Sequence, residues 1–179
     1  MNEARPLHLT SYIAGVPIEN EDLLEVINPY NNEPVGTVTL GRPADAERAM
    51  AAAVEPAERL TRYQRSQVLL GTRDALLEQG EAIAQLIMSE SGLCLRETRY
   101  EVGRASEDLQ FAAMEALRDD GQIFSCDVSP QGKQRKIFTT REPVRLALAI
   151  TPFNHPLNQV VHKLAPAVAA GVPVILTPP

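Results

Sequence analysis

The amino-acid sequence predicts an α/β fold, and three stretches of the chain carry that prediction. Residues 9–40 contain short runs in which apolar and polar side chains alternate, as they do in half-buried β-strands. Residues 44–118 change to the spacing of amphipathic helices. From Leu146 onward, an apolar run, a helical segment and a second apolar run at 172–176 follow one another. This order predicts a βαβ unit with two parallel strands and a right-handed crossover.

The composition limits the kind of protein that this can be. The chain has 179 residues, of which 44% are hydrophobic and 22% charged, which is typical of a globular protein. A formal net charge of −6 without a dense basic stripe argues against nucleic acid as a partner. No apolar run approaches the roughly 20 residues that span a membrane, and the N-terminus lacks an apolar signal core. Cys94 and Cys126 fit neither a disulfide framework nor a zinc pattern, so we expect a cytoplasmic protein with reduced thiols.

The first 40 residues predict short strands. Tyr12-Ile13 and Val16-Pro17-Ile18 flank Ala14-Gly15, a pair that favours a hairpin turn. Two further strands are expected over 24–27 and 35–40. The residues alone favour a β-meander on the surface.

Four helices are expected to follow and to cover one face of a sheet. The first runs over 45–54 and ends before Pro56. Thr61 and Gln64 form a capping box that opens the second, and Gly80 and Gly92 are predicted to end the second and third. The inward faces are predicted to be Val68, Leu69, Leu76 and Leu77 on the second helix, Ile83, Leu86 and Ile87 on the third, and Val102, Ala105, Leu109, Ala112 and Ala116 on the fourth, which spans 95–118.

Three segments in the last part of the chain resemble the aldehyde dehydrogenase superfamily. They are Ile150-Thr-Pro-Phe-Asn-His-Pro-Leu-Asn158, Lys163-Leu-Ala-Pro-Ala-Val-Ala-Ala-Gly171 and Val174-Ile-Leu176. In that family the turn reads Thr/Val-Pro-Trp/Phe-Asn-Phe/His-Pro. The resemblance implies the N-terminal portion of an aldehyde dehydrogenase fold, with short β-strands, a helical layer, an oligomerisation hairpin and the first βαβ unit of a Rossmann-like NAD-binding domain.

The resemblance also implies a division of the chain. Residues 1–120 would hold the N-terminal strands and the helical layer of the NAD-binding domain. Residues 121–141 would form an oligomerisation-type β-hairpin that pairs with a neighbouring subunit, and 142–179 a truncated βαβ unit. The full-length form would then be a homo-oligomer, either a dimer or a tetramer. The alternative is a hairpin that packs on its own domain, because two isolated strands are marginal in water.

Asn154 is the residue that the resemblance assigns to catalysis. Its side-chain amide would be one of the oxyanion-hole donors that hold the aldehyde oxygen while a thiolate attacks the carbonyl carbon. A preorganised donor of this kind is typically worth a few kcal/mol, because it stabilises charge that develops only in the transition state. The alternative is an asparagine that hydrogen-bonds its own turn.

The resemblance implies NAD or NADP as the cofactor. Ile150, Thr151, Pro152 and Phe153 match the segment that lines the nicotinamide side of the site, mostly through shape and main-chain contacts. At 177–179 the family usually has Lys-Pro-Ser, whose lysine reaches the adenosine ribose hydroxyls. Here Thr177 and Pro178 occupy the first two of these positions, and threonine supplies neither the charge nor the reach of lysine.

Arg104 and His155 indicate the class of aldehyde. The helix that carries Arg104 matches the one that lines the aldehyde tunnel in the family, and a guanidinium with a nearby imidazole suits a doubly charged oxyanion. Asn158, one helical turn after Asn154, is a further candidate. The alternatives are a solvated Arg104 paired with Asp108, a His155 that caps a turn, and a surface or cap role for Asn158.

Four stretches together resemble the phosphonoacetaldehyde dehydrogenase branch, which oxidises phosphonoacetaldehyde to phosphonoacetate with NAD in phosphonate catabolism. An anionic or phosphorylated aldehyde of another kind is the alternative substrate. The stretches are Ser91-Gly-Leu-Cys-Leu95, Glu101-Val-Gly-Arg-Ala105, 111–127 and Thr151-Pro-Phe-Asn-His-Pro156.

The nucleophilic cysteine, the basic glutamate and the glycine loop of the family all come later than the segment present here. Cys94 lies between two leucines and is expected to be buried and inert, and Cys126 lies in the predicted hairpin. We therefore expect this chain to be inactive alone. A non-catalytic truncated remnant that acts through hetero-oligomerisation is the alternative to part of a working enzyme.

Overall fold

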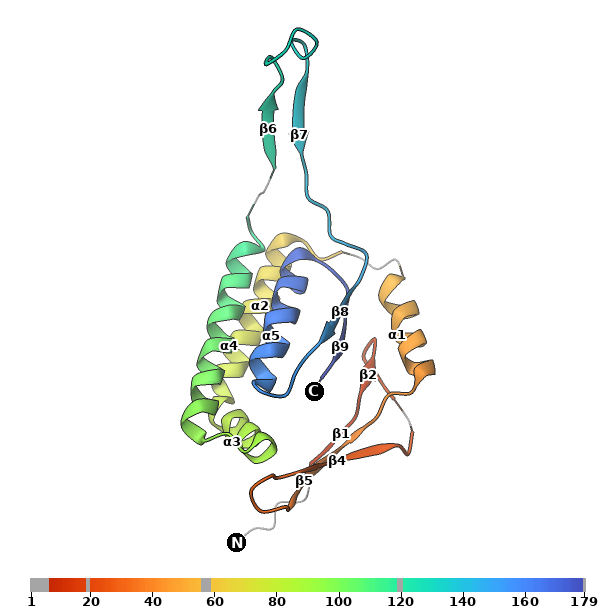
Figure 1. Cartoon of the computed structure of the whole chain (residues 1–179), viewed down its shortest axis with the longest axis vertical. Coiled ribbons are helices and arrows are strands. Elements are labelled where there is room, and N and C mark those ends of the chain that lie inside the picture. Colours follow the sequence, from red (N-terminus) through yellow and green to blue (C-terminus); the bar gives the residue numbers. More distant parts are fainter. Residues whose placement is uncertain (1–6, 19, 56–58, 119–120, 179) are drawn as a thin grey trace.

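The computed structural model describes residues 7–18, 20–55, 59–118 and 121–178, and it confirms the predicted α/β class (Figure 1). The elements are β1 (Leu7–Leu9), β2 (Tyr12–Ile13), β3 (Val16–Pro17), β4 (Leu23–Ile27), β5 (Pro34–Thr39), α1 (Pro43–Val54), α2 (Arg62–Glu78), α3 (Gly80–Ser91), α4 (Leu95–Glu115), β6 (Gln122–Ser125), β7 (Lys136–Thr139), β8 (Ala147–Ile150), α5 (Pro156–Ala170) and β9 (Val174–Thr177).

The early strands form a small sheet and a separate hairpin. β2 and β3 pair antiparallel around Ala14 and Gly15, which both have positive φ, so the predicted turn is confirmed. β4 and β5 are antiparallel neighbours, but β1 lies parallel to β5 on its other side. The sheet is therefore not the simple meander that the sequence favoured, because a parallel neighbour needs a crossover connection.

The core is a layer of helices in which α4 packs against α2, α3 and α5 (Figure 1). Leu69 and Leu76 of α2 are buried in it, as predicted, together with Leu109 of α4. Val68 and Leu77 are exposed, so their predicted inward position was wrong. The reason is that α2 meets the layer along one narrow stripe, and these two side chains lie just outside it.

The helix ends follow the local sequence with one exception. Thr61 accepts from the Gln64 amide at 3.2 Å and its own amide donates to the Gln64 side chain at 2.8 Å, which confirms the capping box. Gly92 ends α3 in the left-handed conformation with φ 73°. Gly80 does not end α2 in this way, because its φ is not positive and it is instead the first residue of α3.

Two glycine substitutions are expected to change stability in opposite directions. A Cβ at Gly92 would lie 2.8 Å from Cγ of Pro29 and the backbone is left-handed, so Gly92→Ala should lower the free energy of unfolding by about 1–2 kcal/mol. At Gly71, inside α2, a Cβ would meet nothing within 4 Å, and Gly71→Ala should raise the same free energy by about 0.5–1 kcal/mol. Urea unfolding measures both. Equal shifts for the two variants would contradict the assigned backbone conformation at Gly92.

The β6–β7 hairpin projects away from the rest of the molecule (Figure 1). Its strands are exposed on both faces, with Ile123 and Phe138 among the most exposed apolar side chains. The hairpin therefore does not pack on its own domain, which was the alternative left by the sequence. Within the described residues, no helix combines the length and the apolar character needed to cross a membrane.

β8 and β9 pair in parallel through α5, which is the predicted βαβ unit. α5 begins with Pro156, whose fixed φ suits a first helical position, and ends at Gly171 with φ 72°. Arg65 of α2 supports the far end of this helix, because its Nε donates to the carbonyl of Ala169 at 3.0 Å. The division of the chain at 120/121 and 141/142 stays a prediction.

Candidate active site

The segment between β8 and α5 lies at the carboxyl end of a parallel strand pair, where α/β sheets bind their ligands. Ile150, Pro152 and Phe153 are exposed there, Phe153 at 80% of its surface. Thr151 is buried instead, and its hydroxyl and its amide both donate to the carbonyl of Thr177, at 3.2 and 3.3 Å. Thr151 therefore ties β8 to β9, and its side chain is already bonded.

Asn154 is exposed in this segment, two residues before the first residue of α5. Its side chain makes no hydrogen bond with any described residue, its own turn included. The alternative role, in which the asparagine stabilises its own turn, is therefore not what the structure contains. The side-chain N–H groups are available to an external acceptor.

Glu101 of α4 is the site residue that the sequence analysis missed. It is 2% exposed, and its Oε1 accepts the backbone N–H of Asn158 at 2.9 Å. Its Oε2 lies 3.6 Å from Nδ1 of His155 and has no hydrogen-bond partner among the described residues. The signal was present in the spacing, because Glu101 lies one turn before the buried Ala105 on the face of α4 that meets α5.

Two of the predicted substrate residues, Arg104 and His155, belong to the two helices that Glu101 joins. Arg104 follows Glu101 by one turn on α4, is exposed, and makes no hydrogen bond or ion pair with a described residue. The suggested Arg104–Asp108 pair does not form, because Asp108 instead lies 2.6 Å from Nε2 of His162. His155 is the N-cap residue of α5, yet its side chain forms no cap hydrogen bond and is 43% exposed.

Asn158 is buried beneath the exposed residues of the candidate site. It is 2% exposed, and its Oδ1 has no hydrogen-bond partner in the described part of the chain. This burial argues against direct contact with an aldehyde, the role for which the sequence made it a candidate, and also against the surface role. Asn158 contributes to the site through its backbone N–H, which donates to the carboxyl group of Glu101.

The carboxyl ends of β8 and β9 fit the nicotinamide half of a dinucleotide better than its adenosine half. Exposed apolar side chains, Ile150 and Phe153, suit the flat face of a nicotinamide ring. On the β9 side, Thr177 and Pro178 are exposed, but the Thr177 hydroxyl donates to the carbonyl of Ala149 at 3.2 Å. Neither Thr177 nor Pro178 offers a cation to a ribose or phosphate group.

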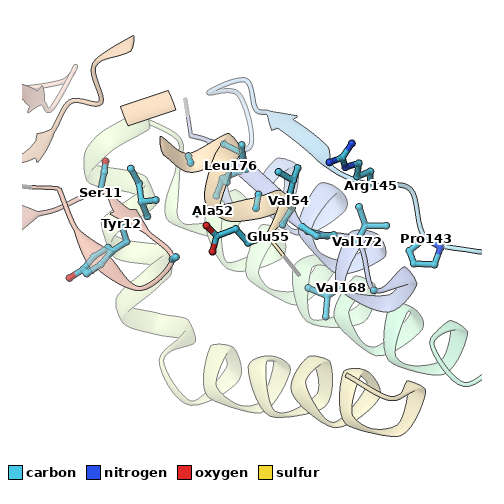
Figure 2. A pocket seen from close by; sticks show the side chains of 18 of the residues that line it. Ser11, Tyr12, Ala52, Val54, Glu55, Pro143, Arg145, Val168, Val172 and Leu176 are labelled. Carbon is cyan, nitrogen blue, oxygen red and sulfur yellow. The ribbon is translucent and has the colours of Figure 1, made fainter. Parts of the chain in front are cut away.

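A wide groove of the described chain lies elsewhere. It has a volume of about 1160 Å³ and lies between α1, β2 and β9, where Tyr12, Ala52, Val172 and Leu176 are among the residues that line it (Figure 2). Asn154, His155 and Arg104 do not line it. The groove therefore does not mark the candidate active site. The exposed side-chain amide of Asn154 and the buried carboxyl group of Glu101 mark it better.

Neither cysteine is part of this site. Cys126 lies just beyond β6, in the projecting hairpin. Cys94 is the N-cap residue of α4 and is exposed, so the prediction of a buried thiol was wrong. Its two leucine neighbours are half-buried, and the cysteine between them turns outward at the start of the helix.

The fold is that of the N-terminal part of an aldehyde dehydrogenase. The sequence profile described as "Aldehyde dehydrogenase family" matches residues 16–179, and the chain belongs to that family. It is similar to a 3-sulfolactaldehyde dehydrogenase of Priestia aryabhattai, with 37% identity over 93% of this chain and 35% of the relative. The chain thus spans about a third of the length of the curated relatives that it matches.

Solved structures agree with this assignment. Aldehyde dehydrogenase 21 from Physcomitrella patens, in complex with the reaction product succinate, has a TM-score of 0.91 and 32% identity, over 98% of this chain and 37% of that one. A betaine aldehyde dehydrogenase variant from Staphylococcus aureus, in complex with NAD+, has a TM-score of 0.84 and 32% identity, over 92% and 34%. The match confirms that the fold is the N-terminal part of the family's fold.

Proposed function

We propose that this chain forms the N-terminal part of an NAD- or NADP-dependent aldehyde dehydrogenase that oxidises an anionic aldehyde to a carboxylate. Phosphonoacetaldehyde, giving phosphonoacetate, is the first candidate substrate. The observation that carries the proposal is the side-chain amide of Asn154, which is exposed at the carboxyl end of β8 and makes no hydrogen bond with a described residue. We further propose that the protein works in the cytoplasm.

The role proposed for Asn154 is to hold the aldehyde oxygen. When a nucleophile adds to the carbonyl carbon, negative charge develops on that oxygen, and an N–H donor fixed in advance stabilises it. The anchoring of the segment on both sides supports this role. Thr151 is bonded to β9 before it, and Glu101 bonds α5 after it.

The cofactor would lie against the same segment. Bound NAD or NADP accepts a hydride from the substrate carbon. Ile150, Pro152 and Phe153 would bound the nicotinamide side and exclude water from it, which their exposure at the strand end supports. The absence of a lysine at Thr177 predicts that this end contributes little to the affinity for the adenosine half.

An anion on the substrate is supported by two observations. The exposed Arg104 lies one helical turn after Glu101 on α4, and the half-exposed imidazole of His155 lies 3.6 Å from the carboxyl group of Glu101. A relative acts on 3-sulfolactaldehyde, and 3-sulfolactaldehyde carries a sulfonate. A phosphonate, like a sulfonate, offers several oxygens to a guanidinium fork.

The first experiment is an assay of the native polypeptide, with its intact mass measured on the same sample. We expect reduction of NAD or NADP with phosphonoacetaldehyde, and slower reduction with 3-sulfolactaldehyde and with uncharged propionaldehyde. A preference for the sulfonate over the phosphonate would replace the candidate substrate but keep the anionic class. A polypeptide of 19.6 kDa with no turnover on any of them would leave the non-catalytic remnant as the explanation.

Arg104→Ala is expected to raise the KM for the anionic aldehyde about 10- to 100-fold, because a hydrogen bond to a charged group is lost. The KM for propionaldehyde should change less than threefold. Arg96→Ala is the matched control, since Arg96 lies on the same helix and is exposed. Equal KM values for the anionic aldehyde in the two variants would show that Arg104 does not hold the anion.

The projecting hairpin supports the proposal of a homo-oligomer. Strands exposed on both faces, with Ile123 and Phe138 outward, leave apolar surface and strand edges that a second subunit would cover. Light scattering on the native polypeptide tests this proposal. A monomer at micromolar concentration would contradict it.

A further inference from the structure

We infer that Glu101 is a positioning residue of the proposed aldehyde site. One of its carboxyl oxygens accepts the Asn158 amide in the first turn of α5, and the other faces the ring of His155. The inference rests on the proposed function. Glu101 is completely enclosed between helices and is separated from Asn158 by 57 positions in the sequence. A carboxyl group is costly to bury, so its contacts need an explanation.

The first contact is a helix cap supplied from another helix. Asn158 is the third residue of α5, and its N–H is the last one at that end without a partner inside the helix, because Gln159 already bonds to the carbonyl of His155. Helix starts commonly satisfy such an N–H with an N-cap serine, threonine or aspartate. Here the N-cap is His155, which forms no cap bond, and Glu101 of α4 accepts the N–H instead.

This arrangement fixes the position of Asn154. The asparagine is separated from the first turn of α5 only by His155, so a shift of that turn moves its amide with it. Displacing a reacting group by about 1 Å can cost a factor of 10² in rate. The buried hydrogen bond between Glu101 and the Asn158 amide therefore helps to fix the position of Asn154, the proposed oxyanion donor.

The second contact releases and orients His155. Because Glu101 caps the start of α5, the imidazole of His155 does not bond to a backbone N–H of the helix. Its Nδ1 instead lies 3.6 Å from Oε2 of Glu101. Since Nδ1 is the ring nitrogen on the side of the carboxyl group, we infer that Nε2 is the one that meets the ligand. Oε2 has no hydrogen-bond partner among the described residues, so this oxygen is available to complete the contact.

Two substitutions separate the two contacts. Glu101→Gln keeps an oxygen that accepts from the Asn158 amide but removes the charge that faces His155. Glu101→Leu removes both. Glu107→Gln is the control, because Glu107 is exposed on the same helix. All three are made in the native polypeptide and assayed with phosphonoacetaldehyde and propionaldehyde.

We expect E101L to lower kcat about 10- to 100-fold for both aldehydes and to speed hydrogen exchange at the start of α5 by a similar factor. E101Q should keep kcat for propionaldehyde and the exchange rate within about threefold, and raise the KM for phosphonoacetaldehyde about tenfold. The ring ¹⁵N signals of His155 should differ between E101Q and wild type, but not between E107Q and wild type.

The outcomes separate the inference from the proposed function. An active wild type whose E101L variant keeps its kcat and its exchange rate overturns the inference alone. If E101L does not fold, an E101Q variant with the His155 signals and kinetics of wild type overturns it equally. A wild type that oxidises no aldehyde overturns the proposed function, and the positioning role in catalysis with it.

Discussion

Replacing Asn154 by alanine is expected to lower kcat for aldehyde oxidation about 10²- to 10³-fold in the native polypeptide. The loss should fall on kcat rather than on KM, because the amide is proposed to bond an oxygen whose charge appears only in the transition state. Stability should change by less than about 0.5 kcal/mol, since the side chain is exposed and bonds no described residue. Steady-state kinetics and urea unfolding measure the two effects.

Asn31→Ala is the control for this prediction. Asn31 is also an exposed asparagine, but it lies in the turn between β4 and β5, where it bonds only to Glu33. It should keep kcat within about twofold. If Asn154→Ala keeps kcat within about threefold as well, the oxyanion role is wrong and the asparagine serves the shape of the turn only.

The second large effect is expected in the helical core. Leu69 is 2% exposed, and Leu69→Ala should lower the free energy of unfolding by about 2–5 kcal/mol, through lost burial and the cavity that remains. Leu77, on the same helix, is 53% exposed, and Leu77→Ala should cost less than about 0.5 kcal/mol. Urea unfolding of the two variants against wild type gives both values.

This pair also decides between two faces of α2. The helical spacing alone placed Leu69 and Leu77 on the same inward side, whereas the structure buries only Leu69. Comparable losses of stability from the two alanines would mean that α2 presents the wider face which the sequence predicted. It would also mean that α2 is rotated relative to the structure.

Features of the fold that depend on neighbouring residues could be predicted from the sequence. The capping box of Thr61 and Gln64 and the left-handed stop at Gly92 are set by the backbone within one turn. Gly80 was misjudged because a glycine between two helices can also open the second one. The parallel partner of β5 was missed because pairing of β1 depends on a crossover, which local alternation does not encode.

The candidate site shows the same difference between features that depend on neighbouring residues and features that depend on distant contacts. Asn154 and His155 could be singled out because the short segment that holds them, at the end of a predicted strand, resembles the corresponding turn of the aldehyde dehydrogenase family. For Glu101, the helical spacing indicated a position on the buried face of α4 but not its hydrogen-bond partner, which is an amide on another helix. The burial of Asn158 followed from the same contact, and a one-turn spacing from Asn154 gave no sign of it. Cys94 was misplaced because leucine neighbours do not determine on which side of a helix start a residue lies.

The two ends of α5 are bonded to residues that come much earlier in the chain. Glu101 holds its first turn, and Arg65, 104 positions before Ala169, holds its last. During synthesis on the ribosome, α2 and α4 leave the exit tunnel before α5 does, so both anchors are in place when 156–170 emerges. We therefore expect the βαβ unit to form on helices that have already folded. A mutation that delays the helical layer should then also delay the assembly of the segment with the proposed oxyanion donor Asn154.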